Sequence, residues 1–230
     1  MQHVQMELEA VSQSLHNDSP LQISPWKLGL VVLLFVWIEA TVIGSISETA
    51  MTELIQEALV LAAAFLFGVA AWRCPSFRSL LVLFAGLFGC MFIRELDALF
   101  DKIFHGFWVY PAVLLAVGTI LYATRCPKID LRQSLDFLTA SSFRSVFFGL
   151  LTVLVISRIV GAGRIWYFIM GSKSVGRLYK NVIQEGLELW GYALIATGAW
   201  CVMSQLTQSW RNHKTQPSPA TKLNTPRSLA

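Results

Sequence analysis

The sequence predicts an all-α integral membrane protein whose six transmembrane helices form a bundle. Three observations lead to this fold class. Apolar residues make up 55% of the chain and charged residues only 14%, whereas an ordinary globular domain carries about 25% charged residues. The mean hydropathy is +0.57, which excludes a disordered chain because disorder needs low hydrophobicity and high charge. Six segments approach the about 20 apolar residues that a helix needs to cross a membrane.

The six expected spans are separated by short polar turns or by turns marked with Pro and Gly, so they pair naturally into three helical hairpins. The spans cover Trp26 to Ile46, Thr52 to Trp72, Ser79 to Phe100, Phe107 to Tyr122, Ser145 to Gly163 and Val182 to Leu206. These runs are too long for a membrane barrel, whose strands need only about 9–11 alternating residues. The fourth and fifth spans are the shortest, so their ends are the least defined.

Polar segments flank this transmembrane domain of residues 26–206. Residues 1–25 carry acidic residues where a signal peptide would be basic, so no cleavable signal is expected. Four apolar residues there share one helix face, which predicts a short amphipathic helix at the cytoplasmic surface or, alternatively, a partner-binding helix: Val4, Leu8, Val11 and Leu15. Residues 207–230 have no apolar periodicity, and we expect a disordered tail.

The distribution of Lys and Arg predicts the orientation of the bundle. Short cytoplasmic loops carry an excess of these residues. With the N-terminus inside, the basic residues of the inner segments outnumber those of the outer segments, which places both termini in the cytoplasm. The loop of residues 164–180 opposes this assignment because it is basic and would lie outside. We therefore expect a multi-pass protein of the cell inner membrane.

A short repeated segment occurs in the second and sixth spans. Residues 55–57 read Ile-Gln-Glu, and residues 183–185 read the same. Apolar sequence of low complexity produces such matches by chance, so an internal duplication is only one explanation. If it is real, the two spans run in the same direction and carry a Glu at the same depth, as in the parallel repeats of some transporters.

Charged residues in the spans share one depth, which is the strongest functional signal in the chain. Five of the six spans place a charge in the outer half of the membrane, and the inner half has almost none. A charge inside a membrane costs several kcal/mol, so it marks a functional site by default. The candidate acidic cluster consists of Glu39, Glu57, Glu95, Asp97, Glu185 and Glu188, with Arg94 and Arg158 as counter-charges. We expect some of these carboxyl groups to be protonated or neutralised by a cation.

A divalent metal is a weaker expectation for the same region. Oxygen and nitrogen ligands suited to such an ion come from Asp101, His105, Glu185 and Glu188. In addition, Arg94, Asp97, Asp101 and His105 have a spacing that puts them on one stripe, if the third helix continues that far. His105 is the only histidine near the cluster, whereas catalytic zinc sites more often use two or three. No cofactor is otherwise evident.

The residues leave several functions open. The acidic cluster favours a small transporter-like protein that binds a cation, a proton or a polar headgroup from the outer side. The alternatives are an intramembrane enzyme, metal-dependent or not, acting on lipids of the outer leaflet, and an accessory or sensor subunit with purely structural ion pairs. Catalytic residues are not identifiable, and nucleotide-binding motifs are missing, so an enzyme is less favoured.

The expected partners follow from the same analysis. The bilayer itself is the first. The loop of residues 164–180 combines aromatic and basic side chains, which is typical of an interfacial belt or of a site for an anionic lipid or a protein partner. Nucleic acid is not expected, because the net charge of +4 is spread over tails and loops and forms no basic platform.

Overall fold

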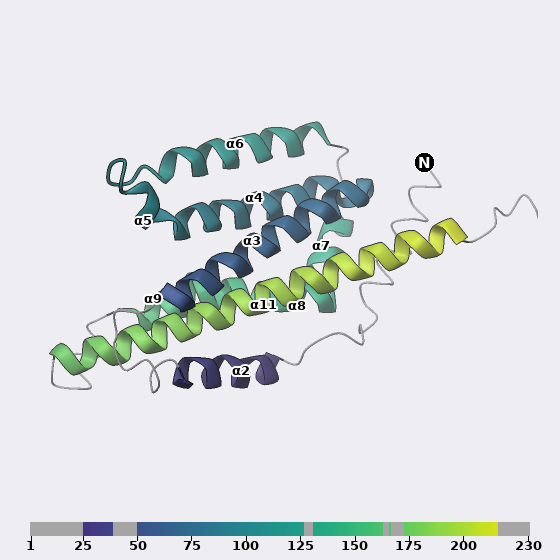
Figure 1. The fold of residues 1–230 in the computed structure, drawn as a ribbon. Helices are drawn as coiled ribbons and strands as arrows, with labels where there is room; N and C mark the ends of the chain where they lie inside the picture. Colours follow the sequence, from purple (N-terminus) through teal and green to yellow (C-terminus); the bar gives the residue numbers. More distant parts are fainter. Residues whose placement is uncertain (1–24, 39–49, 127–130, 163–165, 167–172, 216–230) are drawn as a thin grey trace, which may run out of the picture.

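The computed structural model describes residues 25–38, 50–126, 131–162, 166 and 173–215, and every regular element in these ranges is helical. Figure 1 shows the arrangement. The elements in chain order are α2 (Pro25–Ile38), α3 (Ala50–Arg73), the 3-10 turn η2 (Pro75–Phe77), α4 (Arg78–Glu95), α5 (Asp97–Phe100), α6 (Val109–Arg125), α7 (Leu131–Thr139), α8 (Ser141–Leu151), the π-helical turn η3 (Thr152–Ile156), α9 (Ser157–Val160) and α11 (Lys173–Thr215).

Three helical stretches are long and apolar enough to cross a membrane. They are Met51–Arg73, Pro75–Glu95 and Phe143–Val160, and Val109–Arg125 is a shorter apolar helix. Such segments fold as helices in lipid because a helix satisfies its own backbone N–H and C=O groups. Many large apolar side chains remain exposed on the described bundle, as expected for a surface that faces acyl chains. The described part of the chain is therefore all-helical, with three apolar helices that could span a membrane.

Helix α11 is the centre of the bundle. It packs against α8, α3 and α2, while α3 packs against α4, and α4 against α6. Figure 1 shows that α3 and α11 begin at the same end of the bundle, whereas α4 runs opposite to α3, and α6 opposite to α4. Helix α6 is thus the outermost helix on one side and α2 on the other.

The core of the bundle is aromatic where α3, α4 and α8 meet. Phe67 of α3 stacks on Phe88 at a centroid distance of 5.5 Å, and Phe84 tilts against Phe143 at 4.8 Å. Phe77, at the turn before α4, stacks on Phe137 of α7 at 5.0 Å. Aromatic pairs of this geometry stabilise a core by about 0.5–1.5 kcal/mol beyond their buried area.

Glycines bring α8 and α11 into direct contact. A Cβ atom added at Gly149 would lie 2.6 Å from the carbonyl oxygen of Gly191, and one at Gly198 would lie 2.9 Å from the backbone nitrogen of Val146. Small residues at helix crossings permit such close approach in membrane proteins. The polar residues that follow along both helices are consequently held close together.

The helices differ from the expected spans in several places. Helix α4 ends at Glu95, and α5 is a separate short helix, because the backbone of Leu96 leaves the helical conformation. The expected continuous helix to Phe100 is therefore wrong. Helix α11 extends beyond the expected span of 182–206 at both ends. Helix α7 was not expected; its Phe137 is buried while Leu135 is exposed.

Candidate functional site

Polar side chains of three helices gather at one end of the bundle. They come from the last residues of α4, from α9 and from the first half of α11. This is the end at which α3 and α11 begin (Figure 1). We call this group the charged cluster and define it by the residues that contact one another there: Arg94, Glu95, Ser157, Arg158, Gln184, Glu188 and Tyr192.

Glu95 is the last residue of α4, and two donors hold its carboxylate. The hydroxyl of Tyr192, a fully buried residue of α11, donates a hydrogen bond of 2.5 Å to Oε1 of Glu95. The guanidinium of Arg94 lies 3.5 Å from the same oxygen. The Glu95 side chain is only 16% exposed. The bond joins α4 to α11, although the two helices are far apart in sequence.

Glu188 is buried on α11 and receives contacts from three side chains. The Ser157 hydroxyl of α9 lies 3.1 Å from its Oε1 and the Gln184 amide nitrogen 3.2 Å. The guanidinium of Arg158 lies 3.9 Å from the same atom and is 45% exposed. The carboxylate is thus held on the inside of the bundle while its positive counterpart faces outward.

The π-helical turn η3 positions Ser157. A π turn contains one more residue than an α turn, so it changes the direction of the side chains that follow it, and such turns are frequent at functional sites. Ser157 comes directly after η3 and is fully buried. Its hydroxyl lies 2.7 Å from the carbonyl oxygen of Val153 inside η3 as well as 3.1 Å from Glu188. The irregular turn and the acidic residue therefore share one hydrogen-bonding group.

The two carboxylates belong to a single electrostatic unit. Glu95 interacts electrostatically with Glu188 and with both Arg94 and Arg158. Tyr192 likewise interacts with Glu95 and Glu188. Two acidic and two basic side chains from α4, α9 and α11 consequently occupy one location. A change in the charge of any member alters the potential at the others.

The two Ile-Gln-Glu segments lie side by side. Gln56 of α3 is buried, and its amide nitrogen donates a 3.2 Å hydrogen bond to the carbonyl oxygen of Glu185 on α11. Thr52, one turn before Gln56 on α3, is also buried. The repeated segment thus lies on two neighbouring helices that begin at the same end of the bundle.

The remaining residues of the expected acidic cluster have different surroundings. Glu39 lies outside the described residues. Glu57 is half-buried on α3, next to Gln56, and Asp97 is exposed in α5. Of the sequence-predicted site residues, the structure brings Glu95, Glu188, Arg94 and Arg158 together, and Glu185 lies beside them on α11 through its backbone contact with Gln56.

Asp101 and His105 form a separate pair in the exposed turn after α5. The His105 ring nitrogen lies 2.8 Å from one Asp101 oxygen, and the Gly106 backbone N–H donates to the other at 2.9 Å. The Gly106 hydrogen bond and, to a smaller degree, His105 lower the pKa of Asp101 below its usual value. Gly106 has a φ of +83°, a conformation that favours glycine. The pair therefore stabilises a turn.

The four residues expected to hold a metal are not gathered. In the described ranges, no group of three or more His, Cys, Asp and Glu side chains is arranged to hold a metal ion. Asp101 and His105 contact each other, whereas Glu188 contacts Ser157, Gln184 and Arg158. Of the expected loop site at residues 164–180, the structure describes Trp166 and residues 173–180, which form the start of α11. Trp166 donates to the Val160 carbonyl at 2.7 Å.

Three polar residues of this region were not predicted from the sequence. They are Gln56, Ser157 and Gln184, which all contact α11 or lie on it. The signal was present, because each is a hydrogen-bonding side chain in a segment expected to span the membrane. A search for charged side chains alone does not find neutral hydrogen-bonding residues such as these.

Comparison of the chain with models of protein families, with curated proteins and with solved structures finds no match.

Proposed function

We propose that this chain is a small transporter-like protein of six membrane spans whose charged cluster takes up a proton from the outer side. The observation that carries the proposal is the contact network around Glu95 and Glu188. Two acidic side chains from different helices share one location, and each accepts a hydrogen bond from a buried or partly buried donor. A like charge nearby disfavours the ionised form of a carboxylate, so a site with two carboxylates favours the binding of a proton.

A proton fits this site better than a metal cation. One oxygen of each carboxylate is already engaged by hydroxyl or amide donors, and a guanidinium lies 3.5 Å from Glu95 and 3.9 Å from Glu188. Arg94 and Arg158 repel an incoming metal ion, which would also need several free oxygen ligands. A proton needs only one oxygen lone pair.

Uptake of a proton would change the contacts of the cluster in a defined way. A neutral Glu188 attracts Arg158 much less, so the partly exposed guanidinium is free to turn toward water. The Ser157 hydroxyl also bonds the carbonyl of Val153 within η3, and this second partner allows it to exchange one acceptor for the other. Protonation is thereby linked to the packing of α9 against α11.

The topology part of the proposal places both termini in the cytoplasm and the charged cluster at the outer side of the inner membrane. Three apolar helices support membrane insertion, and α2, α6 and α11 supply the remaining spans. Single cysteines introduced in a cysteine-free background test this orientation. Lys102→Cys should react with an impermeant thiol reagent applied outside intact cells, and Arg125→Cys only after lysis. The reverse pattern contradicts the orientation.

Proton uptake is measured on the full-length protein in proteoliposomes containing a pH-sensitive dye, under an imposed pH gradient. We expect acidification that depends on the protein and is lost in Glu95→Gln and Glu188→Gln. Asp97→Asn is the matched control because Asp97 is an exposed carboxylate two residues from Glu95. Flux that persists in both Gln variants contradicts the proposal. Turnover of an outer-leaflet lipid without flux would instead favour the enzyme alternative.

A further inference from the structure

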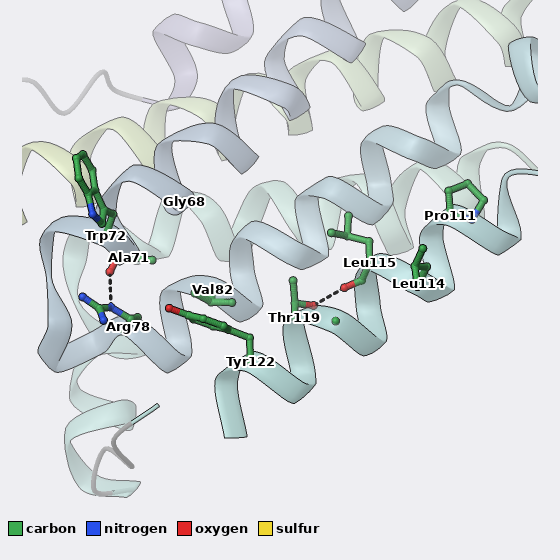
Figure 2. A pocket seen from close by; sticks show the side chains of 11 residues that line it. Gly68, Ala71, Trp72, Arg78, Val82, Pro111, Leu114, Leu115, Thr119 and Tyr122 are labelled. Carbon is green, nitrogen blue, oxygen red and sulfur yellow. Dashed lines mark hydrogen bonds between the residues drawn. The ribbon is translucent and has the colours of Figure 1, made fainter. Parts of the chain in front are cut away.

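A long groove lies between α3, α4 and α6, at a distance from the charged cluster. Its volume is about 760 Å³. Figure 2 shows the side chains that line it, contributed by all three helices. The groove includes the end of α3 and the beginning of α4, so one of its ends is at the side of the bundle opposite to the charged cluster (Figure 1).

The wall of the groove is apolar and contains two glycines. Leu114, Leu115 and Val82 form part of it. A Cβ atom added at Gly68 or at Gly118 would meet no atom within 4 Å. These two glycines therefore do not serve close helix packing, unlike Gly149, whose missing Cβ lets α11 approach. Their effect is to keep the groove open.

The one charged side chain of the groove lining lies at one end, whereas the Thr119 hydroxyl farther along α6 is engaged by the Leu115 carbonyl. Arg78 at the start of α4, Trp72 near the end of α3 and Tyr122 near the end of α6 meet there (Figure 2). The Nε atom of Arg78 donates to the carbonyl oxygen of Ala71 at 3.1 Å, which fixes the side chain in place. In the described part of the chain this leaves both Nη groups of Arg78 as donors for an acidic ligand. Arg125, which is exposed one turn beyond Tyr122, adds a second positive charge at this end.

The length of the groove matches one leaflet of a membrane. From Pro111 to Tyr122 along α6, the lining covers about 16 Å, since a helix rises about 1.5 Å per residue. Half of a hydrocarbon core of about 30 Å is about 15 Å. Aromatic residues such as Trp72, which is 79% exposed, are typical of the interface at which headgroups begin. The polar end is thus at headgroup level when the apolar part is in the leaflet.

We propose that this groove binds an anionic phospholipid, with one acyl chain along Gly68 and Gly118 and the phosphate at Arg78. The charge of Arg78 and Arg125 selects an acidic headgroup, and the apolar wall selects a chain of one leaflet in length. This proposal rests on the insertion of α3, α4 and α6 into a membrane, but it is independent of proton uptake at the charged cluster. Loss of lipid binding and loss of proton flux are consequently separate results.

The headgroup part of the proposal is tested by native mass spectrometry of the full-length protein in detergent. Phosphatidylglycerol is titrated against phosphatidylcholine with identical acyl chains. We expect the wild type to retain phosphatidylglycerol preferentially and Arg78→Gln to reduce its affinity about fivefold, the factor that corresponds to about 1 kcal/mol for one basic residue near the surface. Arg144→Gln, an exposed arginine on α8 outside the groove, should bind as the wild type. Equal retention of both lipids by the wild type would overturn the proposal.

The groove itself is tested by filling it. Gly68→Leu and Gly118→Leu place a side chain in open space, so the fold is expected to remain intact, and both should abolish lipid retention. Ala58→Leu is the control because Ala58 is exposed on α3 outside the groove. Retention that is unchanged in both glycine variants overturns the proposal. A dimer that these variants dissociate would also overturn it, because a second copy of the chain would then occupy the groove.

Discussion

The hydroxyl of Tyr192 donates a hydrogen bond of 2.5 Å to the carboxylate of Glu95, and this bond fastens the end of α4 to the middle of α11. Tyr192 is completely buried, and the Glu95 side chain is nearly so. Water therefore has little access to replace either partner. The bond both stabilises the bundle and determines where one of the two acidic groups of the charged cluster lies.

Removal of the Tyr192 hydroxyl is expected to destabilise the protein. Tyr192→Phe leaves the ring in place but removes a donor to Glu95, and hydrogen bonds between helices in membranes contribute up to about 1–2 kcal/mol. Thermal unfolding in detergent measures the effect. Tyr110→Phe, at a tyrosine that is 64% exposed, is the matched control. Equal stability of the two variants would show that the bond contributes nothing.

Ser157 is expected to be more sensitive to substitution than a serine that only bonds its own helix. Ser157→Ala removes the contact with Glu188 as well as the bond to Val153, and leaving a buried carboxylate with one donor fewer costs about 1–3 kcal/mol. Among the described residues, Ser204 of α11 bonds only the carbonyl of Cys201, at 2.9 Å, so Ser204→Ala should cost at most about 0.5 kcal/mol. Comparison of their unfolding temperatures checks this ranking, and the opposite order contradicts it.

Two glycines should respond in opposite ways to alanine. A Cβ at Gly149 would be 2.6 Å from the backbone oxygen of Gly191, and backbone atoms cannot move aside, so we expect Gly149→Ala to destabilise the protein by about 1–3 kcal/mol. Gly68 has open space at its Cβ, and Gly68→Ala should stabilise α3 by roughly 0.5–1 kcal/mol. Denaturation of both variants in the same detergent measures the two changes in stability. Equal changes would mean that α8 and α11 do not pack this closely.

The turn after α5 is expected to lose its order at acidic pH. The Gly106 N–H and His105 lower the pKa of Asp101 below its usual value of 3.8. Since the pKa is lower in the folded chain, the stabilisation is complete above the usual value and is lost as the pH falls through the lowered one. The amide proton shift of Gly106, followed by NMR from pH 7 downward, should therefore stay constant until the solution is below about pH 4. A transition at a higher pH would contradict this prediction.

Hydropathy located the helices because the requirement for backbone hydrogen bonding in lipid leaves few alternatives. Each of the six expected spans contains a helix in the described residues, and three of the helical stretches are long and apolar enough to cross a membrane. The end of α4 was not foreseen. The polar residues from Arg94 to His105 have a helical spacing, but the helix is interrupted at Leu96. His105 instead contacts Asp101 within a turn that includes Gly106. Helical spacing alone carries no information on where a helix stops.

The charged cluster was only partly accessible to sequence reasoning. The outer-half position of the charges indicated that Glu95, Glu188, Arg94 and Arg158 share a depth, and in the structure they lie together. Which side chains contact each carboxylate depends on how each helix is rotated about its own axis, and the packing between the helices determines this rotation. The π turn before Ser157 and the glycine contacts of α8 set that rotation, and neither has a sequence pattern that distinguishes it from an ordinary apolar helix.

Helix α11 contains 43 residues in one uninterrupted run, which corresponds to about 65 Å at about 1.5 Å per residue. A bilayer with its headgroups is only about 40–45 Å thick. The helix is therefore at least about 20 Å longer than such a bilayer is thick, so it cannot lie wholly within a membrane that it crosses upright.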